Sequence, residues 1–142
     1  FKQSLDWHLL DIHFHRGVQA LVRALNRQLG FEGALHQRDC DGDGFQWIDV
    51  NDRDNSVLSF VRYGSGDARP IAVLVNLTPV PRPGYVVGLP AGGRWREVVN
   101  TDAEQYGGSN VGNGGGVEAR GGPSHGFAHS SAVMLPPLAT LW

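Results

Sequence analysis

The sequence predicts a mainly β domain, a sandwich or partly open barrel of antiparallel strands, preceded by a helical segment. A long helical period occurs in one stretch, residues 16–29. Short strand-like runs separated by turn residues follow from Phe45 onward. Strands at this spacing are typical of sandwiches and barrels. A length of 142 residues corresponds to about one domain.

The helical segment is amphipathic. Its apolar positions recur at helical spacing, and Gly30 follows where a helix C-cap is expected. A shorter apolar group at 5–14 precedes it. A lone helix cannot bury the apolar stripe along one of its own faces, so we expect another part of the protein to cover that stripe. The stripe consists of Val18, Leu21, Val22, Leu25 and Leu29.

The β region divides at turn signals. The apolar run at 71–77 predicts a central strand buried on both sides, while prolines make 79–84 a loop. Residues 90–93 predict a hairpin-like connection, and the glycine-rich stretch at 107–123 predicts a long ordered loop. The expected strands are 45–50, 56–63, 71–77, 85–89, 95–99, 132–135 and 138–142.

Composition excludes several classes of function. Twelve basic and fourteen acidic residues give a net charge of −2, which argues against a nucleic-acid partner. No apolar run reaches the roughly 18 residues of a membrane span, and no signal peptide is visible. The single cysteine, Cys40, fits a reducing compartment. Because the chain opens on Phe1 within an apolar pattern, we expect it to be a piece of a longer protein.

Metal and catalytic motifs are incomplete. Residues 39–44 match half of a calcium loop, but position 12 would be Val50 rather than a bidentate glutamate. The alternative is a polar turn capped by its own aspartates. The histidines lack partners at zinc-site spacing, whether at 8, 13 and 15 or at 125 and 129. We therefore expect no metal and no cofactor.

No nucleophile or phosphate site is expected either. The stretch GGSNVGNGGG at 107–116 has no nearby lysine, so it is not a P-loop. The serines at 109, 124, 130 and 131 lie in no nucleophile-elbow context, and Cys40 has only His36 nearby in sequence. The chain is therefore expected to contain no catalytic residue.

Trp47 is the residue most suggestive of ligand binding. Strict strand alternation would place Trp47 and Asp49 on one face of the strand at 45–50. A tryptophan ring can stack on the C–H face of a sugar, and a neighbouring carboxylate can accept hydroxyl hydrogen bonds. The alternative is a tryptophan packed inside the sandwich. Trp95 and Trp142 are expected in the core.

Six segments together closely resemble the C-terminal end of bacterial 1,4-α-glucan (glycogen) branching enzymes. The resemblance covers essentially the whole chain, in order and with similar spacing. The segments are SLDWHLLD (4–11), HRGVQALVRALNR (15–27), ALHQRDCDGDGFQWIDVND (34–52), VLVNLTPVPRPGY (73–85), GRWREVVNTDAEQYGGSNVGNGGGV (93–117) and LPPLATLW (135–142).

The resemblance implies an architecture of the α-amylase superfamily. Residues 1–36 would be the tail of a catalytic (β/α)₈ barrel that includes its last helix, and residues 37–142 would form a C-terminal antiparallel β-sandwich. The missing barrel would cover the apolar stripe of the helix at 16–29. The implied location is cytoplasmic.

The resemblance also implies a reaction. These enzymes cleave an α-1,4-glucan and transfer the fragment to a 6-hydroxyl, using an aspartate nucleophile and a glutamate acid/base. Both would lie upstream of this chain, so these residues alone are expected to be inactive. Glucan or glycogen is the expected partner, and Trp47 with Asp49 are the candidate surface contacts. Gln46 departs from the glutamate that is usual there.

Alternatives remain open at this stage. The chain could be a free-standing carbohydrate-binding module, a purely structural sandwich, or the C-terminal domain of another glucan-active enzyme of the same superfamily. An exposed row of aromatic residues would favour the first alternative, and a dominant apolar interface at the helix argues against it.

Overall fold

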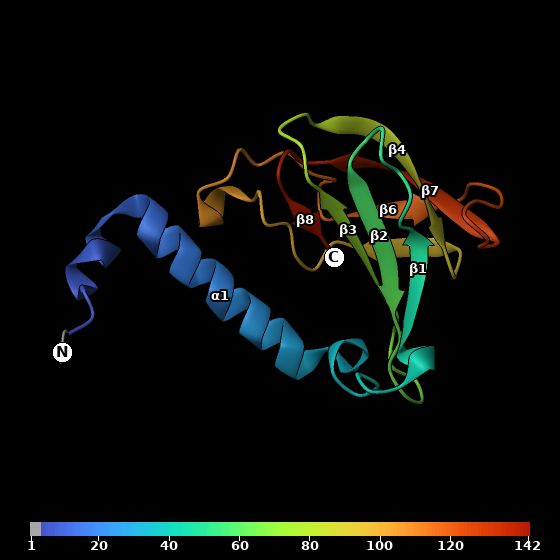
Figure 1. Ribbon diagram of the computed structural model, residues 1–142, viewed down its shortest axis with the longest axis horizontal. Coiled ribbons are helices and arrows are strands. Elements are labelled where there is room, and N and C mark those ends of the chain that lie inside the picture. Colours follow the sequence, from blue (N-terminus) through green and yellow to red (C-terminus); the bar gives the residue numbers. More distant parts are fainter. Residues whose placement is uncertain (1–3) are drawn as a thin grey trace.

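A computed structural model describes residues 4–142. The described part begins with a 3₁₀ turn, η1 (Trp7–Asp11), and one long helix, α1 (His13–Phe31). The helix extends away from the strands and forms an arm on one side of the molecule (Figure 1). The helix that the sequence predicts at 16–29 is confirmed and is longer at both ends. Gly30 is not its C-cap, because the helix continues to Phe31 and Glu32 takes the extended conformation that ends it.

The rest of the chain is a β domain with eight strands in the described residues. A four-stranded antiparallel sheet has the order β1-β2-β3-β8, and two pairs, β4-β7 and β5-β6, complete the layers. The expected mainly β, antiparallel fold is confirmed. The strands are β1 (Phe45–Asp49), β2 (Val57–Arg62), β3 (Ile71–Asn76), β4 (Arg82–Leu89), β5 (Gly93–Arg96), β6 (Gly116–Ala119), β7 (His129–Leu135) and β8 (Thr140–Leu141).

The main core lies between the four-stranded sheet and the two strand pairs. Alternate residues of β2 are buried, and β3 is buried along almost its whole length, as expected for a central strand. The outer face of β3 packs in a second, smaller cluster with Ala34, Phe60 and Trp142. The main cluster comprises Ile48, Val57, Val61, Ala72, Leu74, Val87, Leu89, Ala119, Phe127, Val133, Leu135 and Leu141.

Three local expectations are wrong. Residues 85–89 and 95–99 do not form a hairpin, because β4 pairs with β7 while β5 pairs with β6. The glycine-rich stretch contains β6, in which Gly116 takes a φ of +153° and lies against the Trp95 carbonyl. Strand β4 begins at Arg82, inside the expected loop, and its register shifts between Arg82 and Tyr85 around Pro83. An irregular register accommodates a proline that cannot donate to the ladder.

Candidate functional site

Three of the five residues in the apolar stripe of α1 are exposed, while Leu21 and Leu25 are half-buried. Val18 is 60% exposed, and Val22 and Leu29 are each 50% exposed. We call these three residues the helix stripe. Further exposed apolar side chains lie before and after it in the sequence, so residues 4–142 leave most of this face uncovered. Large continuous apolar surfaces mark interaction sites. The neighbouring exposed side chains are Leu5, Trp7, Ile12, Phe14 and Phe31.

The other side of α1 is fixed to the β domain by a glycine. Gly17 is buried, and a Cβ built there would lie 2.4 Å from the carbonyl oxygen of Tyr106. Tyr106 closes the short 3₁₀ turn η4 (Glu104–Tyr106), and Gly107 follows with a φ of +89°. The missing side chain thus lets backbone pack on backbone, and the helix contacts the loop that contains η4 at this point.

A buried carboxylate holds the loop that meets the helix. Asp102 accepts hydrogen bonds from the backbone N–H of Ser109 (2.9 Å), the Ser109 hydroxyl (2.6 Å) and the backbone N–H of Val111 (3.0 Å). The loop is therefore tied across its base, which fixes the position of Tyr106 under Gly17. Reasoning from sequence missed this role of Asp102; an aspartate seven residues before a serine in a glycine-rich loop was the available signal.

Three aromatic rings gather on the outer face of the four-stranded sheet. The rings of Phe45 and Trp47 are 4.9 Å apart edge to face, those of Phe45 and Phe60 are 5.0 Å apart and stacked, and those of Trp47 and Phe60 are 5.8 Å apart. We call these residues the aromatic trio. Trp47 is 47% exposed, so of the two alternatives left open by the sequence it is not packed inside the sandwich. Phe45 and Phe60 hold the indole in place while part of its surface meets solvent.

Asp49 does not share this face, contrary to the expectation from alternation. The register shifts between Trp47, which pairs with Phe60, and Asp49, which pairs with Ser59. The bulge at Ile48 turns Asp49 toward the inner side, because Ser59 is buried there. Its carboxylate lies 3.7 Å from Nε2 of His125, a residue of the loop before β7. Trp47 and Asp49 are therefore not brought together.

The carboxylates of the acidic turn at 39–44 form ion pairs with arginines. Arg38 donates to Asp41 and to Asp43, and Arg62 pairs with Asp39. Within residues 4–142 no group of three histidine, cysteine, aspartate or glutamate side chains is placed to hold a metal ion. The side-chain hydrogen bonds of Asp39, Asp41 and Asp43 within the described residues are to arginine side chains and not to backbone amides of the turn, contrary to the capping that the polar-turn alternative supposed.

A polar cluster closes one end of the sandwich. The Tyr85 hydroxyl donates to Asp52 (2.8 Å), Asn55 donates to the same carboxylate, and Arg82 donates to Asn55 (2.7 Å). Burial raises the pKa of Tyr85 above its ordinary value, and the bond to Asp52 raises it further. Burial alone would raise the pKa of Asp52, but hydrogen bonds from Asn55 and Tyr85 lower it below 3.8. These shifts arise from a structural network rather than from a catalytic pair.

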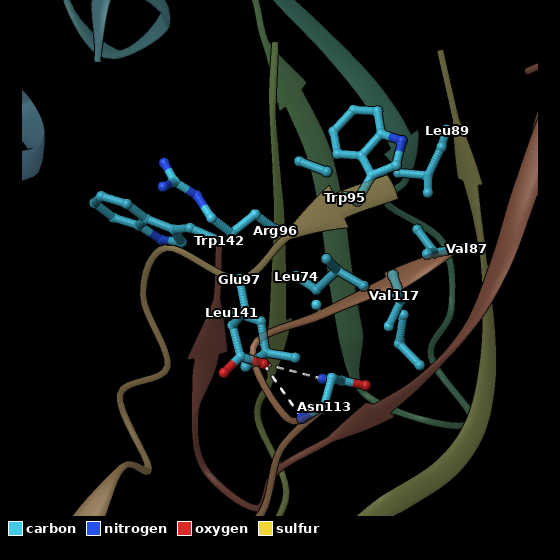
Figure 2. A pocket seen from close by; sticks show the side chains of 13 residues that line it. Leu74, Val87, Leu89, Trp95, Arg96, Glu97, Asn113, Val117, Leu141 and Trp142 are labelled. Carbon is cyan, nitrogen blue, oxygen red and sulfur yellow. Dashed lines mark hydrogen bonds between the residues drawn. The ribbon is translucent and has the colours of Figure 1, made fainter. Parts of the chain in front are cut away.

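Two hollows flank the C-terminal tryptophan. Figure 2 shows the smaller one, an apolar slot whose lining includes Trp95, Trp142, Leu74, Val87 and Leu141. The Glu97 carboxylate accepts from the backbone N–H and the side-chain amide of Asn113 at its polar end (Figure 2). Trp95 and Trp142 pack against the two core clusters, as expected, yet both remain partly exposed.

Membrane insertion of a helix is not indicated. Among the residues that the structure describes, no helix is both long enough and apolar enough to cross a bilayer.

Comparisons with known proteins agree on one family. A family model described as the alpha amylase C-terminal all-beta domain matches residues 47–142. The chain is 57% identical over 136 residues to the 1,4-alpha-glucan branching enzyme GlgB of Burkholderia vietnamiensis, covering 96% of this chain and 18% of that protein. The same-named protein of Rhodospirillum rubrum is 55% identical over 97% of this chain and 18% of its own length.

A third relative has a lower sequence identity. The 1,4-alpha-glucan branching enzyme GlgB of Pseudomonas syringae pv. tomato is 50% identical over 98% of this chain and 19% of its own length. The chain thus spans less than a fifth of the length of the curated relatives it matches.

Proposed function

The chain belongs to the family of alpha-amylase C-terminal all-beta domains, and from this premise we propose that it is the C-terminal portion of a 1,4-α-glucan branching enzyme. The relatives that carry this name match it along almost its whole length. The parent enzyme would cleave an α-1,4-glucan and transfer the fragment to a 6-hydroxyl, so that an α-1,6 branch forms during glycogen synthesis.

The proposed reaction is a two-step displacement by carboxylates. A nucleophile carboxylate forms a glycosyl-enzyme intermediate, and a sugar hydroxyl takes the place that water has in hydrolysis. In barrel enzymes such groups lie on loops at the C-terminal face of the barrel. None of the carboxylates described above is assigned to this role. We therefore propose that the 142 residues alone are inactive and that catalysis belongs to the rest of the parent chain.

The observation that carries the proposal is the exposed helix stripe. Val18, Val22 and Leu29 form an apolar face that the described residues leave mostly uncovered, while Gly17 fixes the helix to the β domain. A helix held on one side and apolar on the other fits a position between two packed bodies. We propose that residues 1–36 complete the catalytic barrel, that residues 37–142 form the C-terminal sandwich, and that the barrel covers the stripe.

The first test compares two double variants in the parent enzyme. Replacing Val18 and Val22 by aspartate should lower the melting temperature and the branching activity together, because two charges would enter the interface. Arg23→Gln with Arg27→Gln, on the opposite face, changes the charge by the same amount and should leave both unchanged. If the two pairs of changes had equal effects, the stripe would not face the barrel. Branching activity in the isolated 142-residue chain would equally overturn the proposal.

We further propose that the aromatic trio holds a glucan chain on the outer surface. Trp47 supports this, since its indole is half exposed and is buttressed by Phe45 and Phe60. Asp49 was the expected polar contact, but its carboxylate faces the other side of the strand, so the proposed contact rests on the trio. One aromatic stack contributes about 0.5–1.5 kcal/mol. Holding a polymer therefore requires several such sites acting together.

Glycogen affinity tests the trio. In the parent enzyme Trp47→Ala should weaken glycogen binding about 2- to 12-fold, the equivalent of one stack, without changing the rate on short oligosaccharides. Val86→Ala removes another half-exposed apolar side chain, on β4, and serves as the control. Unchanged glycogen affinity in the Trp47 variant would refute the contact.

The proposal includes a cytoplasmic location. Cys40 is a free, exposed thiol, which is typical of proteins kept in a reducing compartment. The alternative of a free-standing carbohydrate-binding or structural module would leave the helix stripe in water. If the chain were the C-terminal domain of a different glucan-active enzyme, the barrel of that enzyme would cover the stripe equally well. An assay of the parent chain for new α-1,6 linkages distinguishes a branching enzyme from such a relative.

A further inference from the structure

The second hollow beside Trp142 differs from the apolar slot in its charge. It encloses about 250 Å³ between the end of α1, the loop before β3, strand β5 and the C-terminal residue. Three arginines line it, and we call it the arginine hollow. Its chemically active lining residues are Glu32, Arg69, Arg94, Trp95, Arg96 and Trp142.

Strand geometry aims two of these arginines the same way. Arg94 and Arg96 are two residues apart on β5, so their side chains leave the same face of the strand. Arg69 comes from the loop between β2 and β3, just before Pro70 and the start of β3. Guanidinium groups from two separate elements therefore border one concavity.

The guanidinium N–H groups of these arginines are not all engaged in hydrogen bonds with carboxylates. A guanidinium nitrogen of Arg96 lies 3.9 Å from Glu32, and one of Arg94 lies 3.9 Å from Glu118. Both distances are ion-pair contacts but exceed hydrogen-bonding distance, so these N–H groups remain available to another acceptor. Within residues 4–142, the ion pairs include no carboxylate within 4.0 Å of Arg69. The lining thus brings together three guanidinium groups; Glu32 lies at ion-pair distance from Arg96, Glu118 lies at ion-pair distance from Arg94, and the carboxylate of Trp142 adds a further negative charge, so Arg69 is the one of the three with no carboxylate side chain within 4.0 Å in the described residues.

The remaining lining is aromatic. Trp95 is fixed by donating from its indole N–H to the Ala91 carbonyl (3.0 Å), and Trp142 packs on the outer side of β3. Flat indole surfaces suit the C–H face of a sugar ring. Arginines suit a phosphate, because planar N–H pairs match its oxygens. The volume lies below the roughly 300–1,000 Å³ of sites for drug-sized ligands, which favours a ligand the size of one sugar residue.

From these features we infer that the arginine hollow is a binding site for a phosphorylated hexose. The phosphate contacts the guanidinium groups of Arg69, Arg94 and Arg96, and the sugar ring lies against Trp142, because Trp95 leaves the opposite face of β5 and packs against the main core. A neutral glucan chain would leave Arg69 without an anionic partner. The phosphorylated hexose could be a free sugar phosphate or a phosphate ester on a glucan chain, because both present the same group.

Calorimetric titration of the parent chain tests the inference. Glucose 6-phosphate should bind, and Arg69→Gln with Arg94→Gln should weaken its binding about tenfold or more, the effect of losing charged hydrogen bonds. Arg53→Gln with Arg23→Gln removes the same charge at exposed positions outside the hollow and should leave binding unchanged. A maltohexaose that carries one phosphate ester distinguishes the two sources: binding as tight as that of glucose 6-phosphate assigns the site to the polymer.

Several outcomes would overturn the inference. These are absence of glucose 6-phosphate binding, equal weakening in the control pair, and maltose binding at the same strength. Inorganic phosphate binding as tightly as the ester would reduce the hollow to an anion site and refute the sugar contact. Melting temperatures of both double variants distinguish a lost ligand contact from a lost fold, since all four arginines lie at the surface. Branching activity without the phosphate ligand is a separate readout, so its presence or absence bears on the proposed function alone.

Discussion

The contact between Gly17 and Tyr106 offers a test of how the helix joins the β domain. Gly17→Ala places a methyl group 2.4 Å from the Tyr106 carbonyl oxygen, and this neighbour is backbone that cannot rotate away. Either the helix or the loop at 102–111 must move. Gly30→Ala is a matched control in the same helix, because nothing lies within 4 Å of a Cβ at that position.

The expected magnitudes follow from two opposing effects. Replacing glycine by alanine within a helix stabilises it by about 0.5–1 kcal/mol at either position, with the smaller gain near the helix end. Overpacking at Gly17 costs about 1–3 kcal/mol. Since the propensity gain largely cancels between the two variants, Gly17→Ala should be less stable than Gly30→Ala by about 1–3 kcal/mol. Gly30→Ala itself should be at least as stable as the unchanged chain.

The assay is urea unfolding followed by circular dichroism, with amide hydrogen exchange to localise the effect. Exchange in Gly17→Ala should accelerate in α1 and in the loop around Tyr106, and the strands of the main core should keep their protection. Equal stability of the two variants would refute the close backbone contact. Faster exchange confined to the core would show that the helix is not the element displaced.

Three further perturbations have defined outcomes. Asp102→Ala should lower the free energy of unfolding by about 1.5–3 kcal/mol, since charged hydrogen bonds from Ser109 and Val111 are lost. Asp102→Asn should lower it less. Equal losses of the two variants in urea unfolding would contradict the hydrogen-bonding role. The raised pKa of Tyr85 means that its neutral form is favoured by folding, so stability should fall as pH rises above 10, and Tyr85→Phe should flatten that alkaline loss in thermal melts. The lowered pKa of Asp52 means that folding favours its ionised form, so its contribution to stability is present above pH 3.8 and disappears as pH falls below that value. Asp52→Asn should therefore make the melting temperature less sensitive to acid. An unchanged loss of stability in acid would refute the network.

Local patterns predicted the elements better than their pairing. The period of α1 and the continuous apolar run of β3 were sufficient to identify both, because burial of those faces depends on spacing within one segment. Pairing depends on contacts between distant segments, so the expected hairpin from β4 to β5 was wrong. Strand β6 was missed because Gly116 and its glycine neighbours carry no side-chain pattern; its pairing depends instead on the backbone approach of Gly116 to Trp95.

The bulge at Ile48 explains why the candidate site was only half predictable. Alternation correctly placed Trp47 with Phe45, but it assumes one residue per pleat, and a single extra residue reverses every later side chain. Ile48 joins the main core, as alternation already predicts for the residue after Trp47, and the register shift places Asp49 on the inner side as well, opposite the buried Ser59. Asp49 is then turned toward His125. The register shift therefore separates the carboxylate of Asp49 from the indole of Trp47, and a polar partner for a glucan beside Trp47 must come from a residue other than Asp49.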